Sequence, residues 1–414
     1  MTQGSAPGPT QLERPGRPQR TFGPQQLQSA EETVAEKLTQ FARNRFAITQ
    51  AMAEKFKVSL PPEVEQFFAA VEAGRWDEAK TAFEELKSRR ATTDSLNQLW
   101  GPIMETYGVV HAAHEWPAQK LLDYGQAVLG SLRPGMVYAG GTDAGRFIPT
   151  LLNETGGGEQ HVVLTQNALA DNSYRNYFDF LYHDQLATLS EEDSQRAFSE
   201  YMADAQKRLV HDQQNPDEPK QVRPGEGLRL DNGRFTVSGQ VAVMAINERL
   251  LQMLMDKNPD SRFALEESFP FKSTYSAAVP LGPVMELRAP SAEAAYTPER
   301  ATEAVDYWRS TTQQLLSDPE LTADSAARRE YAKMASTQAG LLADHNLNDQ
   351  ADQAFQLATE LCPSSPEPVF RYINLLLGQN RKQDALQVAQ TAVTADPNNE
   401  QFRALLDQLK KAGR

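Results

Sequence analysis

The chain has 414 residues, 40% hydrophobic and 23% charged, which is enough to bury a core and excludes a wholly disordered chain. Lys and Arg number 41 against 55 Asp and Glu, and the resulting net charge of −14 argues against nucleic acid as a partner, because an acidic surface repels phosphates. The single cysteine, Cys362, excludes an intrachain disulfide and any zinc or iron–sulfur site built from several cysteines.

Residues 1–29 are typical of a disordered tail, because Pro, Gly and Gln occupy 15 of the 29 positions. They lack the basic start and apolar stretch of roughly 7–15 residues that a secretory signal requires. No apolar run in the chain approaches the roughly 20 residues that span a membrane, so we expect no transmembrane segment. We therefore expect a cytoplasmic protein by default, or a protein of the cell envelope if a leader has been removed.

Residues 30–133 are predicted to be helical, because apolar side chains recur there every three or four positions. Two short helices on either side of Gly74 are expected to form a hairpin. The expected helices cover 30–57, 62–74, a segment starting at Trp76, and 96–132 with breaks near Gly101–Pro102 and at Pro117.

Residues 134–290 are predicted to form an α/β domain. The apolar runs 136–139 and 161–165 have the character of strands, and a helical pattern follows each one, which indicates a βαβ unit with parallel strands. The sheet is expected to be parallel or mixed, with helices on both faces. The remaining expected elements are helices 174–182 and 191–211, a loop at 213–227, a hairpin across Asn232-Gly233, a buried helix at 240–255, strands 263–265 and 284–287, and a connecting helix at 298–316 capped by Thr297.

The last part of the chain repeats itself with a period of 34 residues. Ala351, Phe355, Ala358 and Pro363 recur as Ala385, Ala389, Ala392 and Pro397. A helix–turn–helix unit of this length, with small residues where helices cross and a closing proline, resembles the tetratricopeptide repeat. The stretch 74–79 resembles the turn and second helix of the same repeat. The departures from the repeat pattern are Ala335, Ala339, Val369 and Ile373.

The tetratricopeptide resemblance implies an α-solenoid at the C-terminus, ending in a capping helix at 399–411, with a groove for a protein partner. The simpler alternative is that these helices only hold the protein together. The expected organisation is a tail at 1–29, a helical region with a repeat-like hairpin at 30–133, the α/β domain at 134–290, a connecting helix at 291–325, and repeats with their cap at 326–414.

The central strings VYAGGTDAGRFIPTLL, HVVLTQNALADNSY, SGQVAVMAIN, FALEESFPF and GPVMELR resemble the soluble C-terminal domain of certain bacterial membrane proteins. Those proteins are multi-spanning, glycosyltransferase-like and similar to protein O-mannosyltransferases. The resemblance covers about Pro134 to Arg288. It implies no glycosyltransferase activity here, because such transfer chemistry is placed in membrane spans and this chain has none.

Polar residues follow three predicted strands at their carboxyl ends, where an open α/β sheet binds its ligands. Arg146 is expected to contact an anion held by the backbone amides of Gly140 and Gly141. Acidic residues at this edge also allow a cation-bridged or hydroxyl-rich ligand, with Asp143 and Glu266 as acceptors. The simpler explanation is that Thr142 or Asp143 caps the next helix. The candidate ligand-binding residues are Gly140, Gly141, Thr142, Asp143, Arg146, Gln166, Asn167, Glu266, Glu267 and Ser268.

Other patterns carry less chemistry. His111 and His114 share a helical face beside Glu115, but no third ligand is near in sequence, so we expect no metal site. No nucleophile elbow, zinc-protease motif or kinase-like set of motifs is present, so we assign no catalytic residue. Whether the protein is an enzyme stays open, and we expect no cofactor. Cys362 is expected to be a small core residue.

Two hypotheses follow. The first is a protein-interaction or scaffold protein that holds a protein partner on its helical repeats, with a non-catalytic or ligand-sensing α/β domain. The alternative is an enzyme or binding domain for a sugar or nucleotide-type ligand at the strand ends. The alternative requires strands 136–139, 161–165 and 262–266 to be parallel neighbours.

Overall fold

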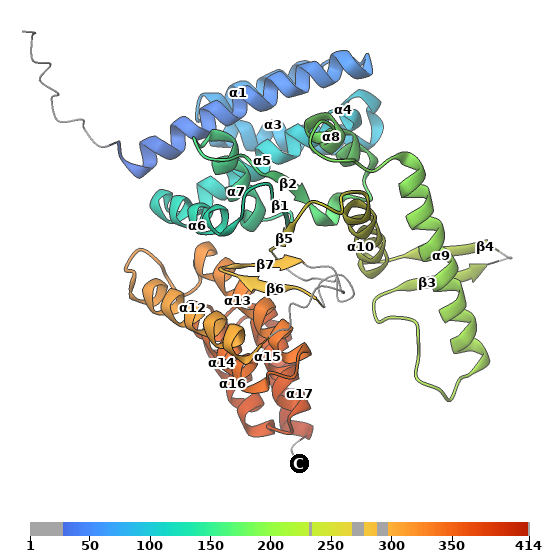
Figure 1. Cartoon of the computed structure of the whole chain (residues 1–414), viewed down its shortest axis with the longest axis vertical. Coiled ribbons are helices and arrows are strands. Elements are labelled where there is room, and N and C mark those ends of the chain that lie inside the picture. The colour runs from blue at the N-terminus through green and yellow to red at the C-terminus, as the bar shows by residue number, and fades with distance from the viewer. Residues whose placement is uncertain (1–27, 232–233, 267–276, 288–296, 413–414) are drawn as a thin grey trace, which may run out of the picture.

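The computed structural model describes residues 28–231, 234–266, 277–287 and 297–412. N-terminal helices, a central sheet and C-terminal helices succeed one another along the molecule, and an arm extends to one side (Figure 1). Among the described residues, no helix combines the length and the apolarity needed to cross a membrane.

The N-terminal helices match the predicted pattern except at one break. The expected hairpin around Gly74 is confirmed, and so is the break at Pro117. The first break lies at Leu99 rather than at Gly101–Pro102, because proline is compatible with the first turn of a helix. These elements are α1 (Ala30–Phe56), α2 (Pro62–Glu72), α3 (Trp76–Arg89), the 3-10 helix η1 (Arg90–Thr92), α4 (Asp94–Gln98), α5 (Trp100–Glu115) and α6 (Ala118–Ser131).

The central sheet is mixed and has the strand order β2-β1-β5-β7-β6. The ligand hypothesis requires three strands to be parallel neighbours, and they are. Strand β1 pairs in parallel with β2 on one side and with β5 on the other. The strand β6 was not anticipated. The strands are β1 (Val137–Gly140), β2 (Val162–Thr165), β5 (Phe263–Leu265), β6 (Val279–Leu281) and β7 (Val284–Leu287).

Helices cover both faces of the sheet, as predicted. Tyr138 contributes to a core on one face, while its neighbours Val137 and Ala139 contribute to the core on the other. Because both faces are buried, the strands are apolar at nearly every position. The helices that follow β1 and β2 are α7 (Ala144–Thr155) and, after the 3-10 helix η2 (Gln166–Ala168), α8 (Asn172–Tyr182).

The arm combines α9 (Glu191–Gln214) with the antiparallel strands β3 (Gly227–Asp231) and β4 (Arg234–Ser238), and it leads into α10 (Gln240–Lys257). The predicted hairpin is confirmed, although its Asn-Gly turn lies outside the described residues. The predicted helix at 240–255 is confirmed, but it is not buried along its whole length, because Val243 near its start is 49% exposed. Its later turns, with Leu250, Leu251 and Leu254, pack on the sheet.

The C-terminal helices are α12 (Pro298–Ser317), α13 (Ala326–Asp344), α14 (Asn348–Leu361), α15 (Pro366–Gly378), α16 (Lys382–Ala395) and α17 (Glu400–Ala412). Five described helices follow residue 325, Ala358 and Ala392 are buried among them, and the predicted N-cap of α12 by Thr297 is confirmed. Cys362 is fully buried, as expected.

Two turns in this region are equivalent. Asn346 and Asn380, 34 residues apart, both have φ of 61°, the left-handed conformation that asparagine tolerates at a helix end. The backbone amide of the residue after each asparagine donates a hydrogen bond to the carbonyl five residues earlier. These bonds run from Leu347 to Leu342 and from Arg381 to Leu376. The repeat in sequence is therefore also a repeat in backbone geometry.

Candidate functional site

The sheet brings most of the predicted ligand residues to one edge. The amide of Gly141, after β1, donates to Oε2 of Glu266, after β5, at 3.1 Å. Nδ2 of Asn167, after β2, lies 3.4 Å from Oγ1 of Thr142. The strand ends therefore converge as expected. Two further candidates, Glu267 and Ser268, lie outside the described residues.

The glycines at this edge make room for a carboxylate of the chain itself. A Cβ atom on Gly140 would lie 2.6 Å from Oε2 of Glu266, and one on Gly145 would lie 1.8 Å from Oε1. The side chain of Glu266 is fully buried against this loop. The position predicted for a bound anion is thus occupied by Glu266, and the expectation of an external anion on these amides is wrong.

Arg146 does not face a ligand either. It is 3% exposed, its Nε donates to the carbonyl of Gly141 at 2.9 Å, and its Nη1 contacts Glu105 of α5 at 2.7 Å. Glu105 also binds Arg45 and Tyr177. Arg146 is therefore part of a buried charged network that joins α7 to the N-terminal helices, and the expectation that it meets a bound anion is wrong.

Lys333 of α13 is the residue at this edge that sequence reasoning missed. Its ammonium lies 2.7 Å from Oδ2 of Asp143, 2.8 Å from Oε1 of Glu266 and 2.7 Å from Oε1 of Glu330. Ligand atoms of the three acidic residues lie within 4.8 Å of one another, which is the spacing of a metal site. The ammonium of Lys333 supplies the cation that such a cluster needs.

One lysine does not neutralise three carboxyl groups. Burial raises the pKa of the Glu330 carboxyl well above its ordinary value; the Lys333 ammonium opposes this rise, and the charges of Asp143 and Glu266 add to it. Burial also raises the pKa of Tyr138, whose hydroxyl donates to the carbonyl of Gly145 at 2.8 Å. At this acidic edge, burial and the neighbouring carboxylates therefore favour the protonated form of Glu330.

Asp143 is the N-cap residue of α7, at the start of the helix as predicted, but its side chain makes no capping hydrogen bond. Capping through the side chain is therefore not the role of this carboxylate. One carboxylate oxygen, Oδ2, binds Lys333, whereas Oδ1 is buried and accepts no hydrogen bond from the described structure.

The β2 side of the edge is closed by α10. Gln166 is fully buried, and Asn247 of α10 donates to the carbonyl of Asn167 at 3.1 Å and accepts from the amide of Ala170 at 2.7 Å. These contacts make Gln166 and Asn167 parts of the packing between η2 and α10.

The histidine pair is not brought to a third metal ligand. His111 lies 3.6 Å from Glu115, and His114 stacks on Trp76 with ring centres 4.9 Å apart. Within the described residues, the acidic cluster around Lys333 is the one group with the spacing of metal ligands.

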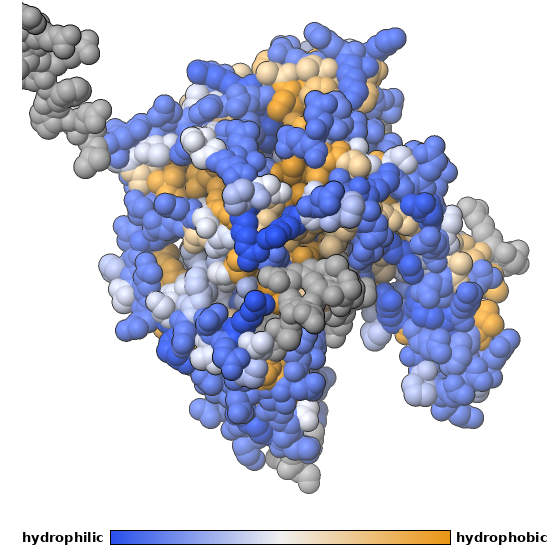
Figure 2. All heavy atoms as spheres, viewed as in Figure 1, coloured by the Kyte–Doolittle hydropathy of each residue, from blue (hydrophilic) through white to orange (hydrophobic). Residues whose placement is uncertain are grey.

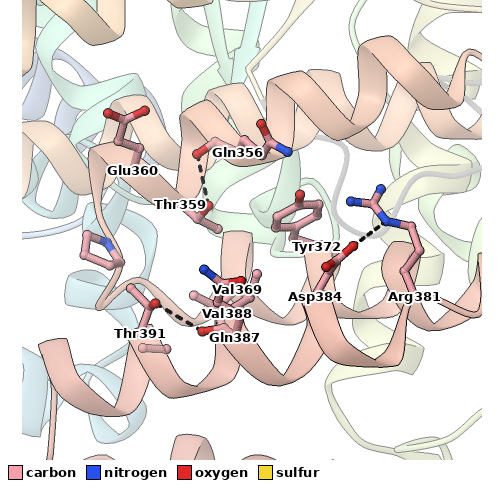
Figure 3. A pocket seen from close by; sticks show the side chains of 12 residues that line it. Gln356, Thr359, Glu360, Val369, Tyr372, Arg381, Asp384, Gln387, Val388 and Thr391 are labelled. Atoms are coloured by element: carbon pink, nitrogen blue, oxygen red, sulfur yellow. Dashed lines mark hydrogen bonds and ion pairs between the residues drawn. The ribbon is translucent and has the colours of Figure 1, made fainter.

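A second candidate site is a groove of about 450 Å³ between α14 and α16, with α15 as its floor (Figure 3). Val369, Val388 and Ala392 supply its apolar part. At one end Arg381 pairs with Asp384 at 2.7 Å and with Asp352 at the same distance. Glu360 stands at the opposite end, apart from that charge network (Figure 3).

Comparison with protein-family models, curated proteins and solved structures finds no match for this chain. The two resemblances noted in the sequence therefore remain predictions.

Proposed function

We propose that this protein is a protein-interaction module that holds an extended segment of a partner in the groove between α14 and α16. In this proposal α13–α16 are two tetratricopeptide-type units and α17 is their cap. The observation that carries it is the pair of equivalent turns at Asn346 and Asn380, which extends the 34-residue sequence repeat to backbone geometry. Alanines buried at 351, 358, 385 and 392 add to its support.

The groove between α14 and α16 is the better candidate surface because the inner helix of the first unit is already engaged. Gln338 of α13 donates to the carbonyls of Gly282 and Val284 at 2.9 and 3.0 Å and accepts from Trp308 at 2.9 Å. These bonds fix α13 against the sheet and α12. A partner segment would therefore meet the outer helices α14 and α16.

The lining of the groove defines the chemistry of the partner. Arg381 is already balanced by Asp352 and Asp384, so it offers little to an anionic segment. Val388 and Val369 suit an aliphatic side chain, and Glu360 suits a basic one. We therefore propose a segment in which an aliphatic residue lies next to Lys or Arg. Hydrophilic side chains predominate over the C-terminal helices on the face shown in Figure 2.

The α/β domain serves as a non-catalytic frame in this proposal. At the strand ends the carboxylate of Glu266 accepts from the amide of Gly141 and pairs with the ammonium of Lys333. The groups expected to contact a sugar or nucleotide phosphate therefore contact one another. An acidic edge also disfavours phosphate. A sugar or nucleotide-type ligand at this edge is therefore the less favoured alternative.

The test is a selection of peptides from a random displayed library on the full chain, followed by photo-crosslinking. A p-benzoylphenylalanine residue replaces Gln387, which lines the groove, and in a matched control replaces the exposed Gln390 on the same helix. The proposal predicts enriched peptides with an aliphatic–basic pair that crosslink at 387 and not at 390. Absence of enriched peptides, or equal crosslinking at both positions, would contradict it.

A further inference from the structure

The groove between α14 and α16 presents acidic and apolar surface close together. Glu360 is exposed at one end, and Pro363 and Val388 are half-buried, so both keep apolar surface open to an occupant. Glu360 lies apart from the charge network of Arg381 at the other end (Figure 3). The groove therefore suits an aliphatic side chain and a cation held a short distance apart.

The segment that precedes the described structure has a charge opposite to that of the chain as a whole. Residues 1–27, here termed the leading segment, contain three arginines and a single acidic residue, Glu13, whereas the whole chain has a net charge of −14. The arginines are Arg14, Arg17 and Arg20. Opposite charges favour contact between this segment and acidic surface of the same chain.

Leu12 and Arg14 supply the aliphatic side chain and the cation. They are two positions apart, and side chains at that spacing lie on the same face of an extended backbone, roughly 7 Å from one another. Pro15 disfavours a helical conformation at Arg14 and favours an extended one. In an extended backbone Glu13 faces the other way, so it does not oppose Glu360.

We infer that the leading segment occupies this groove within its own chain, with Leu12 on Val388 and Pro363 and the guanidinium of Arg14 at the carboxylate of Glu360. This step rests on the proposed function, because it assigns an occupant to the same groove. The segment then competes with a partner and regulates its access to the site.

The start of α1 and the Glu360 end of the groove border one hydrophobic core. That core contains Val34 near the start of α1 and Leu361 at the end of α14, together with side chains of α5 and α13. Helix α1 packs on α5, α5 and α13 line a common cavity, and α13 packs on α14. Three steps between neighbouring helices make roughly 30 Å. Arg14 stands 14 positions before Gln28, the first described residue, and an extended proline-rich segment of that length spans roughly 43 Å.

Tethering makes a weak contact effective. A short tether holds the segment at an effective concentration of about 1 mM, so a contact with a dissociation constant of about 0.5 mM fills about two thirds of the grooves. A partner peptide then binds about threefold less tightly than it would to an empty groove.

The first test is photo-crosslinking of the full chain at low micromolar concentration. A p-benzoylphenylalanine residue replaces Gln387, which lines the groove, or Gln390 as the control. Proteolysis and mass spectrometry should show position 387 joined to residues 10–16 of the same chain, and position 390 should not be joined to them. No crosslink at 387, equal crosslinking at both positions, or crosslinks only between two chains would overturn the inference.

Charge reversal tests the ion pair. Arg14→Glu should lower the yield at position 387 roughly threefold, whereas Arg17→Glu, the matched control, should leave it unchanged. Adding Glu360→Arg to Arg14→Glu should restore the yield, because the pair forms again with its charges exchanged. Equal effects of the two arginine variants, or no restoration, would contradict the assignment.

The affinity of a selected aliphatic–basic peptide separates failure of this inference from failure of the proposed function. By titration calorimetry the peptide should bind Arg14→Glu roughly threefold more tightly than the natural protein. Equal affinities would overturn the inference and leave the proposed function in place. A crosslink at 387 without binding of any selected peptide would support the inference and contradict the proposed function.

Discussion

The ammonium of Lys333 lies 2.8 Å from Oε1 of Glu266, although the two residues are 67 positions apart and belong to a C-terminal helix and the end of a central strand. The same ammonium contacts Asp143 at the start of α7. A single side chain therefore ties α13 to two separate strand ends. Because its charge is the cation of a buried acidic cluster, the C-terminal helices and the sheet should depend on one another for stability.

Replacing Lys333 with Met should lower the free energy of unfolding by about 3 kcal/mol, because it removes the cation from a buried group of carboxylates and keeps the aliphatic length. Urea unfolding followed by circular dichroism measures the difference. A decrease of less than about 1 kcal/mol in the free energy of unfolding would mean that this contact is no stronger than an ordinary surface ion pair.

Glu330→Gln provides the matched comparison at the same cluster. Burial and the neighbouring carboxylates raise the pKa of Glu330 well above its ordinary value, which favours the neutral form of this residue in the folded protein. The substitution should change the stability by less than about 1 kcal/mol near neutral pH or increase it. A large loss would mean that Glu330 is ionised and needed by Lys333.

The pH dependence of stability should differ between the natural protein and Glu330→Gln. A carboxyl whose pKa is raised by folding contributes stability that is complete below its ordinary pKa of 4.5 and is lost as the pH rises through the folded value. The natural protein should therefore lose stability relative to Glu330→Gln as the pH increases above 4.5. Urea midpoints of both proteins across this range measure the difference, and parallel curves would contradict the account.

Ala392→Leu should cost about 1–3 kcal/mol, because Ala392 is buried where α16 crosses its neighbours and a larger side chain overpacks that crossing. Ala395→Leu, near the exposed end of the same helix, is the control and should stay within about 0.5 kcal/mol. Thermal unfolding of both variants checks the difference. Equal effects would show that the crossing is not tightly packed.

The arm should loosen in acid through Glu226. Burial alone would raise its pKa, but the hydrogen bonds from Arg208 and Tyr201 outweigh burial and lower the pKa to about 2. The stability from this carboxylate is present above pH 4.5 and is lost as the pH falls toward 2.

After allowance for solvent screening, that loss amounts to about 2 kcal/mol. Nuclear magnetic resonance of the Leu228 and Val237 methyl groups follows the hairpin as the pH falls. Glu226→Gln should already be loosened at neutral pH and should show no further change between pH 4.5 and 2. A Glu226→Gln arm that matches the natural one would contradict this role.

Patterns of apolar and turn residues predicted the helices and strands well, because these elements depend on interactions between residues close together in the sequence. Alternation across the Asn-Gly turn predicted β3 and β4, and burial on both faces explains the apolar runs of β1 and β2. The convergence of Gly141 and Glu266 followed from the topology of parallel strands. The equivalent asparagines at 346 and 380 were a further signal of the repeat, available from their 34-residue spacing.

The occupants of the site could not be predicted in the same way. Lys333 reaches the strand ends from a helix 190 residues beyond Asp143, and no local pattern records that distance. Arg146 satisfied the motif for an anion contact, but its partner Glu105 is 41 positions earlier. Ion pairs between residues far apart in the chain produce no periodic pattern in a sequence. The three-dimensional structure is therefore needed to see that the charged groups at this edge of the sheet pair with one another.

The most direct test of the proposed function is the affinity of a selected aliphatic–basic peptide, measured by calorimetry, for the natural protein and for two valine variants. Val388→Glu places a charge in the groove, and Val243→Glu places the same charge on an exposed valine of α10. The proposal predicts that Val388→Glu weakens binding roughly tenfold or more and that Val243→Glu leaves it unchanged. Unchanged binding by Val388→Glu, or equal losses in both variants, would contradict it.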